Sequence, residues 1–300
     1  MKYFLLGLIF MGVTCLVSFS DVCVNESFAG TTADDWIFTS SAGDGASLTA
    51  GTGVDADGNG WLRLTEDKDN QASFAYYNTP ISTAAGLMFT FDFVVWGSSS
   101  LADGFTLAIF DASVTPAAGG YGGSLGYAQR YTTPGLAGGI VGFGFDTFGN
   151  FSLNNDGKEG GLEKTSNAIA IRGSQGVTGT DGYEYITNTG SLDSFSTRSV
   201  SNRDDAVVHT VRITIPTTKQ ISIDWQVDGA EEWISLIDDF QCTLDCPTNV
   251  MFGFTGGTGS VSSNQEIRNL SVASVPEPVC MILILFAGAI GLWVRRRFMY

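Results

Sequence analysis

The chain has 300 residues, of which 44% are hydrophobic, only 15% are charged and 38 are glycine. This length suits one large all-β domain or two smaller domains, because all-β domains often extend to about 250 residues undivided. Asp and Glu outnumber Lys and Arg by 31 to 15, for a formal net charge of −16, and so acidic a surface excludes binding to a nucleic-acid backbone as the main role.

Residues 1–20 are predicted to be a secretory signal peptide. Lys2 is followed by an apolar stretch over 3–17 and by small residues up to Ser20, which is the pattern of a cleaved export signal. Cleavage before Asp21 would release the mature protein into a compartment that permits disulfides.

Segment 55–66 fits the residue pattern of an EF-hand calcium loop. The matching residues are Asp55, Asp57, Asn59, Gly60 and Glu66. An EF-hand needs a helix on each side, whereas residues 61–65 alternate like a strand. We therefore interpret the segment as an Asp- and Gly-rich turn, with a loose calcium site in the loop as the alternative.

Short strand-like stretches follow one another along the rest of the chain, separated by turns rich in Gly, Ser, Thr and Asp. The predicted strands are 61–65, 88–94, 105–110, 168–171, 208–215, 221–227, 233–237, 250–254 and 267–272. No long helical pattern and no linker interrupts residues 21–274. This arrangement predicts one all-β domain, a β-sandwich or jelly roll.

Segment 138–161 is the candidate site around which the other motifs are arranged. Bulky residues alternate with glycines over 141–145, so one face of this predicted strand is small enough for a ligand or another backbone to approach closely. Its end and the following loop offer oxygen ligands from Asp146, the Phe148 carbonyl, Asn150 and Asp156. Such a set suits Ca²⁺, and the alternative is an Asx-rich turn between two strands.

The histidine and cysteine residues point to structural roles. The single histidine, His209, lies in a predicted strand without a Ser or Cys nucleophile motif nearby, so neither a zinc site nor a catalytic histidine is expected. Cys242 and Cys246 could close a short loop as a disulfide in an exported domain. The pairing of Cys23 is left open.

The C-terminal segment 275–300 is predicted to be a sorting signal. Val-Pro-Glu-Pro at 275–278 precedes an apolar run over 279–294 and three arginines at 295–297. This order resembles the PEP-CTERM signal of Gram-negative bacteria, which implies recognition by an exosortase-type enzyme. The alternative is an ordinary transmembrane anchor. Either way, the basic cluster stays in the cytoplasm, and residues 21–274 are placed outside the cell.

Five short motifs between residues 62 and 270 together resemble the L-type (legume-like) lectin family. They are ADGFT at 102–106, GGSLG at 122–126, FDTFGN at 145–150, HTVRI at 209–213 and GFTGGTG at 253–259. The resemblance implies a concanavalin A-like two-sheet jelly roll. It also implies an exported lectin that binds glycans or exopolysaccharide at the cell surface or in the extracellular matrix, through a shallow pocket organised by Ca²⁺.

The resemblance also implies a role for each matching residue. Asp103, after a cis peptide bond, would accept hydrogen bonds from sugar hydroxyls, Gly123 and Asn150 would donate to the sugar, and the Phe148 ring would stack on it. The implied calcium ligands are Asp146, the Phe148 carbonyl, Asn150 and Asp156. Asp156 lies one position beyond the acidic ligand of plant members, where Asn155 aligns.

Several features separate the chain from plant members and from enzymes. The position of the glutamate that binds Mn²⁺ in plant members is Gly144 here, and no histidine follows until His209, so no Mn²⁺ site is expected. A jelly-roll glycosidase needs two carboxylates across the scissile bond, and the E-x-D-x-E run that usually supplies them is missing. The alternatives to a lectin are a structural adhesin of the same fold and, less favoured, a glycoside hydrolase.

Overall fold

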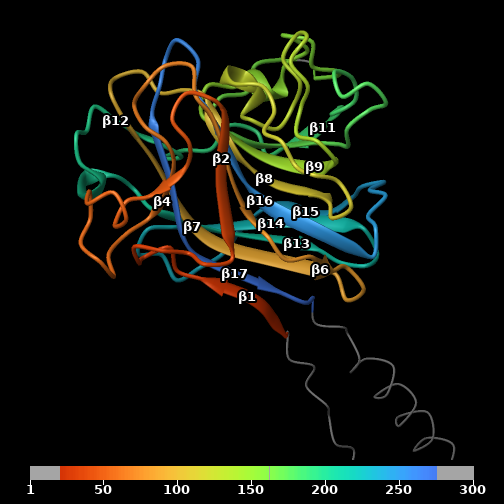
Figure 1. Cartoon of the computed structure of the whole chain (residues 1–300), viewed down its shortest axis with the longest axis horizontal. Coiled ribbons are helices and arrows are strands. Elements are labelled where there is room, and N and C mark those ends of the chain that lie inside the picture. The colour runs from red at the N-terminus through yellow and green to blue at the C-terminus, as the bar shows by residue number, and fades with distance from the viewer. Residues whose placement is uncertain (1–20, 162, 276–300) are drawn as a thin grey trace, which may run out of the picture. The chain divides into compact units, whose positions relative to one another are not determined.

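The structure is a computed structural model that describes residues 21–161 and 163–275, of which 22–275 belong to one compact unit. It is a two-sheet β-sandwich (Figure 1), which confirms the predicted all-β fold. The predicted signal peptide and the apolar run 279–294 lie outside these residues. Within the described ranges, no helix is both long and apolar enough to cross a membrane.

The first sheet, called the back sheet here, has nine strands. They are β1 (Val22–Glu26), β3 (Ser47–Leu48), β4 (Leu62–Thr65), β7 (Leu87–Gly97), β12 (Thr197–Arg198), β13 (His209–Ile215), β14 (Gln220–Val227), β15 (Ile234–Gln241) and β17 (Asn264–Ala273). Their order is β15-β14-β13-β7-β17-β4-β3, with β1 beside β17 and β12 beside β7. All pairings are antiparallel except that of β12 with β7.

The second sheet, called the front sheet here, has eight strands. They are β2 (Trp36–Ala42), β5 (Ala72–Tyr77), β6 (Ile81–Ser82), β8 (Gly104–Asp111), β9 (Gly139–Asp146), β10 (Ala168–Arg172), β11 (Tyr185–Asn188) and β16 (Asn249–Gly257). Their order is β11-β10-β9-β8-β16-β5-β2, with β6 beside β16. The helical segments in the described part are three 3₁₀ turns, η1 (Gly122–Ser124), η2 (Asn150–Ser152) and η3 (Arg203–Asp205).

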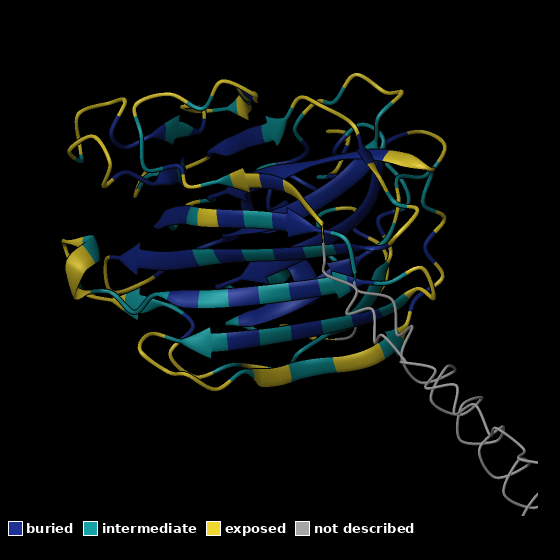
Figure 2. Ribbon diagram, turned by 90° about the horizontal axis from the view of Figure 1, so that it is seen from below, coloured by how far each residue is buried: buried dark blue, intermediate teal, exposed yellow. Residues whose placement is uncertain are grey.

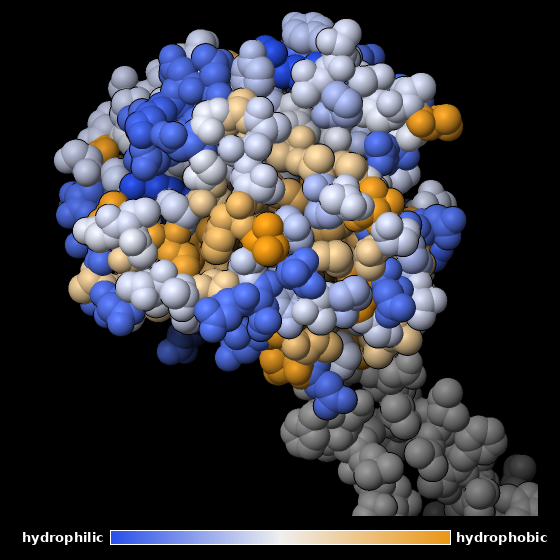
Figure 3. Space-filling model, viewed as in Figure 1, coloured by the Kyte–Doolittle hydropathy of each residue, from blue (hydrophilic) through white to orange (hydrophobic). Residues whose placement is uncertain are grey.

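The core between the sheets is rich in phenylalanine. Along β7, buried Phe89, Phe91 and Phe93 alternate with half-buried residues that face outward, and Figure 2 shows similar banding on other back-sheet strands. Phe105 of β8 stacks on Phe145 of β9 with ring centroids 4.4 Å apart. Burying each such side chain contributes about 1.5–3 kcal/mol. At the surface, apolar side chains lie mainly toward the middle of the face seen in Figure 3.

The front sheet is also covered on its outer face, where aromatic rings from loops replace solvent. Every residue of β9 is buried. A Cβ on Gly142 would lie 2.6 Å from the Tyr127 ring, and one on Gly144 would lie 2.3 Å from the Phe151 ring. The rings of the neighbouring segments therefore pack against the glycine face of this strand. This packing accounts for the small residues, and no bound ligand is needed to explain them.

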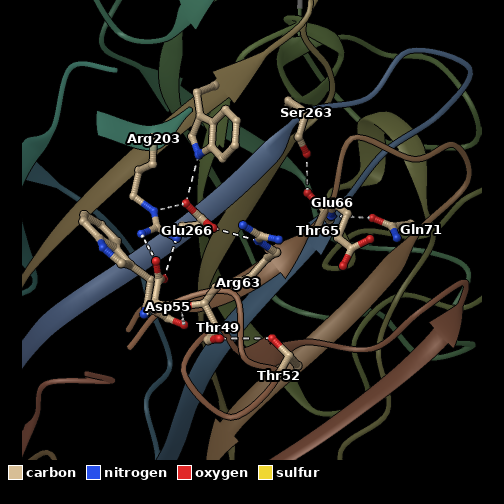
Figure 4. A network of polar contacts seen from close by, with 12 residues as sticks. Thr49, Thr52, Asp55, Arg63, Thr65, Glu66, Gln71, Arg203, Ser263 and Glu266 are labelled. Atoms are coloured by element: carbon tan, nitrogen blue, oxygen red, sulfur yellow. Dashed lines mark hydrogen bonds and ion pairs between the residues drawn. The ribbon is translucent and has the colours of Figure 1, made fainter. Parts of the chain in front are cut away.

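A buried ion-pair network on the outer face of the back sheet holds the acidic loop 55–66 (Figure 4). Glu266 is fully buried and accepts hydrogen bonds from Arg63 at 2.7 Å and Arg203 at 2.6 Å. Arg203 also pairs with Asp55 at 2.9 Å. Asp55 is thus part of an ion pair, and no helix flanks the loop in the described chain, so the structure agrees with a turn and not with an EF-hand.

Candidate functional site

Segments far apart in the sequence meet at one end of the front sheet. Gly104 at the start of β8 pairs with Asp146 at the end of β9. The backbone N–H of Asp103 donates to Gly257 (3.1 Å), and that of Gly122 in η1 donates to Thr258 (3.1 Å). In Figure 1 the loops between β8 and β11 gather at the top of the molecule, while β1 lies at the bottom.

Asp103 lies between two glycine-rich loops. The peptide bond between Ala102 and Asp103 is cis, as the resemblance implied. The Asp103 carbonyl accepts hydrogen bonds from the backbone of Thr147 (2.9 Å) and Phe148 (3.2 Å), which tie it to the loop after β9. Burial raises the pKa of its carboxyl group to about 7, opposed by a hydrogen bond from the backbone of Gly259.

Gly123 and Asn150 are in direct contact beside Asp103. A Cβ on Gly123 would lie 2.4 Å from the Asn150 Cβ and 3.2 Å from its Nδ2, so the amide side chain rests on the glycine. A Cβ on Gly122 would lie 3.8 Å from the Asp103 Oδ2. The structure therefore brings together the three residues that the resemblance predicts to exchange hydrogen bonds with a sugar.

The aromatic surroundings differ from the expectation. The Nζ of Lys164 lies 3.3 Å from the centroid of the Phe148 ring and covers one face of it. Tyr131, which the sequence analysis did not single out, is 61% exposed, and its backbone N–H donates to the Asp156 carbonyl at 2.5 Å. Arg130 stacks on Tyr121 at 4.0 Å. An exposed ring therefore lies beside the site at Tyr131.

The Asp146 side chain holds the loop that follows β9 in place through hydrogen bonds. It is fully buried, and its two carboxylate oxygens accept hydrogen bonds from the backbone of Gly149 (2.6 Å) and Phe151 (2.7 Å). Burial raises its pKa to about 7 against the effect of these two bonds. The Phe148 carbonyl, another predicted calcium ligand, accepts a hydrogen bond from the Ser166 hydroxyl at 2.6 Å.

A lysine that the sequence analysis missed lies among the predicted calcium ligands. Lys158 is 1% exposed, its Nζ is 3.8 Å from the Asp156 Oδ2, and this Nζ has no hydrogen-bond partner. Burial, together with the like charge of Arg172, lowers its pKa to about 8, while the carboxylates of Asp156, Asp146 and Asp103 act in the opposite direction. A positive group therefore already stands within electrostatic range of three carboxylates.

Two of the predicted calcium ligands are already engaged within the protein in this arrangement. Both carboxylate oxygens of Asp146 accept backbone N–H groups, and the Phe148 carbonyl accepts the Ser166 hydroxyl. The Asn155 Oδ1 is buried without a partner, which a bound cation could satisfy, but the Lys158 ammonium would stand beside that cation. The side chains as placed therefore favour an internal cation over a bound one.

Arg172 is a second buried cation that organises the loop. It is fully buried at the end of β10 and donates to the backbone carbonyls of Phe151 (2.7 Å), Leu153 (2.9 Å), Glu159 (2.7 Å) and Tyr183 (2.8 Å). Its sequence signal is the arginine that ends the otherwise apolar run 168–172. Residues 151–159 are thus fixed by a side chain of the neighbouring strand.

The remaining residues named from the sequence lie in the core or beneath the surface. His209 is fully buried, stacks on Trp225 at 4.6 Å, and has its Nε2 2.7 Å from the Ser194 carbonyl, which confirms a core histidine. Cys242 and Cys246 both carry free thiols in the structure, so the disulfide suggested between them is not formed there.

Comparison with solved structures identifies the fold. The VIP36 exoplasmic/lumenal domain in a Ca²⁺/Man2-bound form aligns with a TM-score of 0.54 and 16% identity over 83% of this chain and 86% of that domain. A lectin from Bauhinia forficata in complex with GalNAc aligns with a TM-score of 0.53 and 20% identity, over 86% and 99%.

Lectin I-B4 from Griffonia simplicifolia in its metal-free form aligns with a TM-score of 0.55 and 18% identity, over 84% and 99%. No family model and no curated protein sequence matches the chain. The likeness therefore rests on structure, and it establishes that the sandwich has the legume-lectin fold.

Proposed function

We propose that this protein, a sandwich of the legume-lectin fold, binds glycans through Asp103, Gly123 and Asn150 and performs no chemistry. The observation that carries the proposal is the meeting of these three residues at one end of the front sheet, with Asp103 beside Gly122 and Asn150 resting on Gly123. The named structures that share this fold include forms bound to Man2 and to GalNAc.

The chemistry of the three residues suits a sugar. The Asp103 carboxylate is an acceptor for neighbouring hydroxyl groups, and the Asn150 amide supplies both a donor and an acceptor. The exposed ring of Tyr131 offers an apolar face to the C–H groups of a sugar. Because loop contacts hold Asp103 and Asn150 before a ligand arrives, the ordering cost of binding is small.

We propose that the protein acts outside the cell. The signal-like residues 1–20 and the PEP-CTERM-like segment 275–300 support export, membrane attachment through 279–294 and handling by an exosortase-type enzyme. The glycan partner would then be a surface glycan or an exopolysaccharide. A shallow single site binds weakly, so display of many copies would supply useful avidity.

The proposal is tested on a glycan array with the compact unit 22–275, with calcium and then with EDTA, because calcium remains a prediction of the family resemblance. We expect binding to a defined glycan set, lost in Asp103→Asn and kept in the control Asp193→Asn, which changes an exposed aspartate. Equal binding by Asp103→Asn would place the site elsewhere on the sandwich. A folded domain that binds no glycan would favour the structural adhesin.

A further inference from the structure

The position of Lys158 needs an explanation, because a buried ammonium group without hydrogen bonds is strongly unfavourable unless opposite charges compensate it. Lys158 has no hydrogen-bond partner for its Nζ, and its side chain is fully buried. A tight turn, closed by a 2.8 Å bond from its backbone N–H to the Asn155 carbonyl, directs the chain back toward Asp156. The compensation comes from carboxylates of the candidate site.

We propose that the Lys158 ammonium is the cation of this site: it pairs with Asp156 at 3.8 Å and takes the place of calcium, so that glycan binding does not require the metal. The claim that glycan binding needs no calcium rests on the proposed function. The claim that Lys158 takes the place of a metal ion does not depend on it. Lys158 is a positioning residue, since it acts through the carboxylates and not on the sugar.

The geometry around the ammonium supports this role. The Lys158 side chain is fully buried and its Nζ lies 3.8 Å from the Asp156 Oδ2, so this carboxylate supplies a compensating charge. A divalent cation would have to displace the ammonium or accept a like charge as a neighbour in a buried setting, where such repulsion is screened little.

The rest of the loop is also held without a metal ion. Both oxygens of Asp146 accept backbone N–H groups, and Arg172 donates to four backbone carbonyls from Phe151 to Tyr183. Calcium would fix this loop by binding its oxygen atoms. Here the side-chain cations of Arg172 and Lys158 interact with oxygen atoms of the loop instead.

The first test measures the effect of the metal alone, by thermal unfolding of the unit 22–275 in millimolar calcium and in EDTA. We expect the wild-type Tm to be the same in both. In Lys158→Ala, which opens space among the carboxylates, calcium should raise the Tm by several degrees, because a ligand of the folded state stabilises it. Lys219→Ala, which changes an exposed lysine, should behave like the wild type.

The second test repeats these conditions with a glycan identified on the array. Wild-type affinity should be unchanged by EDTA, whereas Lys158→Ala should lose at least about tenfold, or 1.4 kcal/mol, and recover when calcium is added. Recovery by calcium is a result that a purely packing role of Lys158 would not produce.

Three results would overturn the inference: a wild-type Tm that rises with calcium, a Lys158→Ala protein equal to wild type in EDTA, or a folded Lys158→Ala protein that gains nothing from calcium. If Lys158→Ala does not fold, the wild-type response to calcium decides. A wild-type protein that ignores calcium and binds no glycan would contradict the proposed function and leave the cationic role of Lys158 supported.

Discussion

At the residue scale, the contact between Gly123 and Asn150 is the most sensitive part of the candidate site. An added Cβ on Gly123 would lie 2.4 Å from the Asn150 Cβ, far inside the usual contact distance. Gly123→Ala should therefore displace Asn150, weaken glycan binding at least about tenfold and lower the free energy of unfolding by about 1–3 kcal/mol. Isothermal titration and urea unfolding would measure the two effects.

The matched control is Gly45→Ala. Gly45 is exposed, and its added Cβ would meet no atom closer than 3.6 Å. Both measurements on this variant should equal those of the wild type. Unchanged glycan affinity in Gly123→Ala would show that Asn150 takes no part in binding.

His209 carries a prediction about pH, since burial lowers its pKa below the usual 6.5 despite the hydrogen bond to Ser194. The unfolded chain binds a proton near pH 6.5 and the folded chain does not. The stability from this group is therefore present above pH 6.5 and is lost as the pH falls toward its folded pKa. The free energy of unfolding of wild type should fall relative to His209→Phe over that range.

The measurement is urea unfolding of both proteins between pH 7.5 and 5.5, joined to NMR of the imidazole, which is the single one in the chain. Its resonances should keep their neutral positions below pH 6.5. A normal titration near pH 6.5 would contradict the burial of His209.

The sequence located some site residues and missed others for a physical reason. Asp103, Gly123 and Asn150 belong to short motifs whose order could be matched, and the structure brings them together. Lys158 and Arg172 belong to no motif. Their roles depend on burial and on charges contributed by distant strands, which spacing along one chain does not reveal.

At the element scale, β10 and the loop it supports should lose stability together when Arg172 is changed. Arg172→Met leaves four backbone carbonyls without their donor, and breaking a buried charged contact of this kind costs about 3–5 kcal/mol. Urea unfolding should show that loss, and amide exchange should become faster over residues 151–159.

Arg198→Met is the control, because Arg198 is the exposed residue of β12. Its unfolding free energy should stay within about 0.5 kcal/mol of wild type. If Arg172→Met were equally stable, the loop would be held by Asp146 and its backbone contacts alone.

The core strands could be predicted because the alternation of apolar and polar residues in their sequences matches the alternation of buried and half-buried positions in the fold. The expected strand 88–94 lies within β7, and 208–215 nearly equals β13. The side chains that cover the outer face of β9 could not be predicted. A run of glycines indicates that another group packs closely on the strand, but it does not indicate which group. The rings of Tyr127 and Phe151 come from loops that have no periodic pattern of their own.

At the scale of the whole molecule, the net charge of −16 should make stability depend on salt. Repulsion among like charges opposes the compact state, and salt at about 0.15 M shortens its range to about 8 Å. The unit 22–275 keeps 29 of the 31 acidic residues and 11 of the 15 basic ones, so its Tm should rise between low-salt buffer and physiological NaCl, as scanning calorimetry would show. A falling Tm would mean that ion pairs such as Arg203–Asp55 outweigh the repulsion.

The two ends of the sandwich are neighbours: Val22 of β1 pairs with Ala273 of β17. From the glycine-rich loop beside Asp103, β17 runs ten residues to this point, or about 33 Å, so the ends lie far from the candidate site (Figure 1). A domain with adjacent ends can be inserted into a surface loop of another protein. This sandwich is therefore suited to transplantation as a cassette whose recognition end faces away from its host.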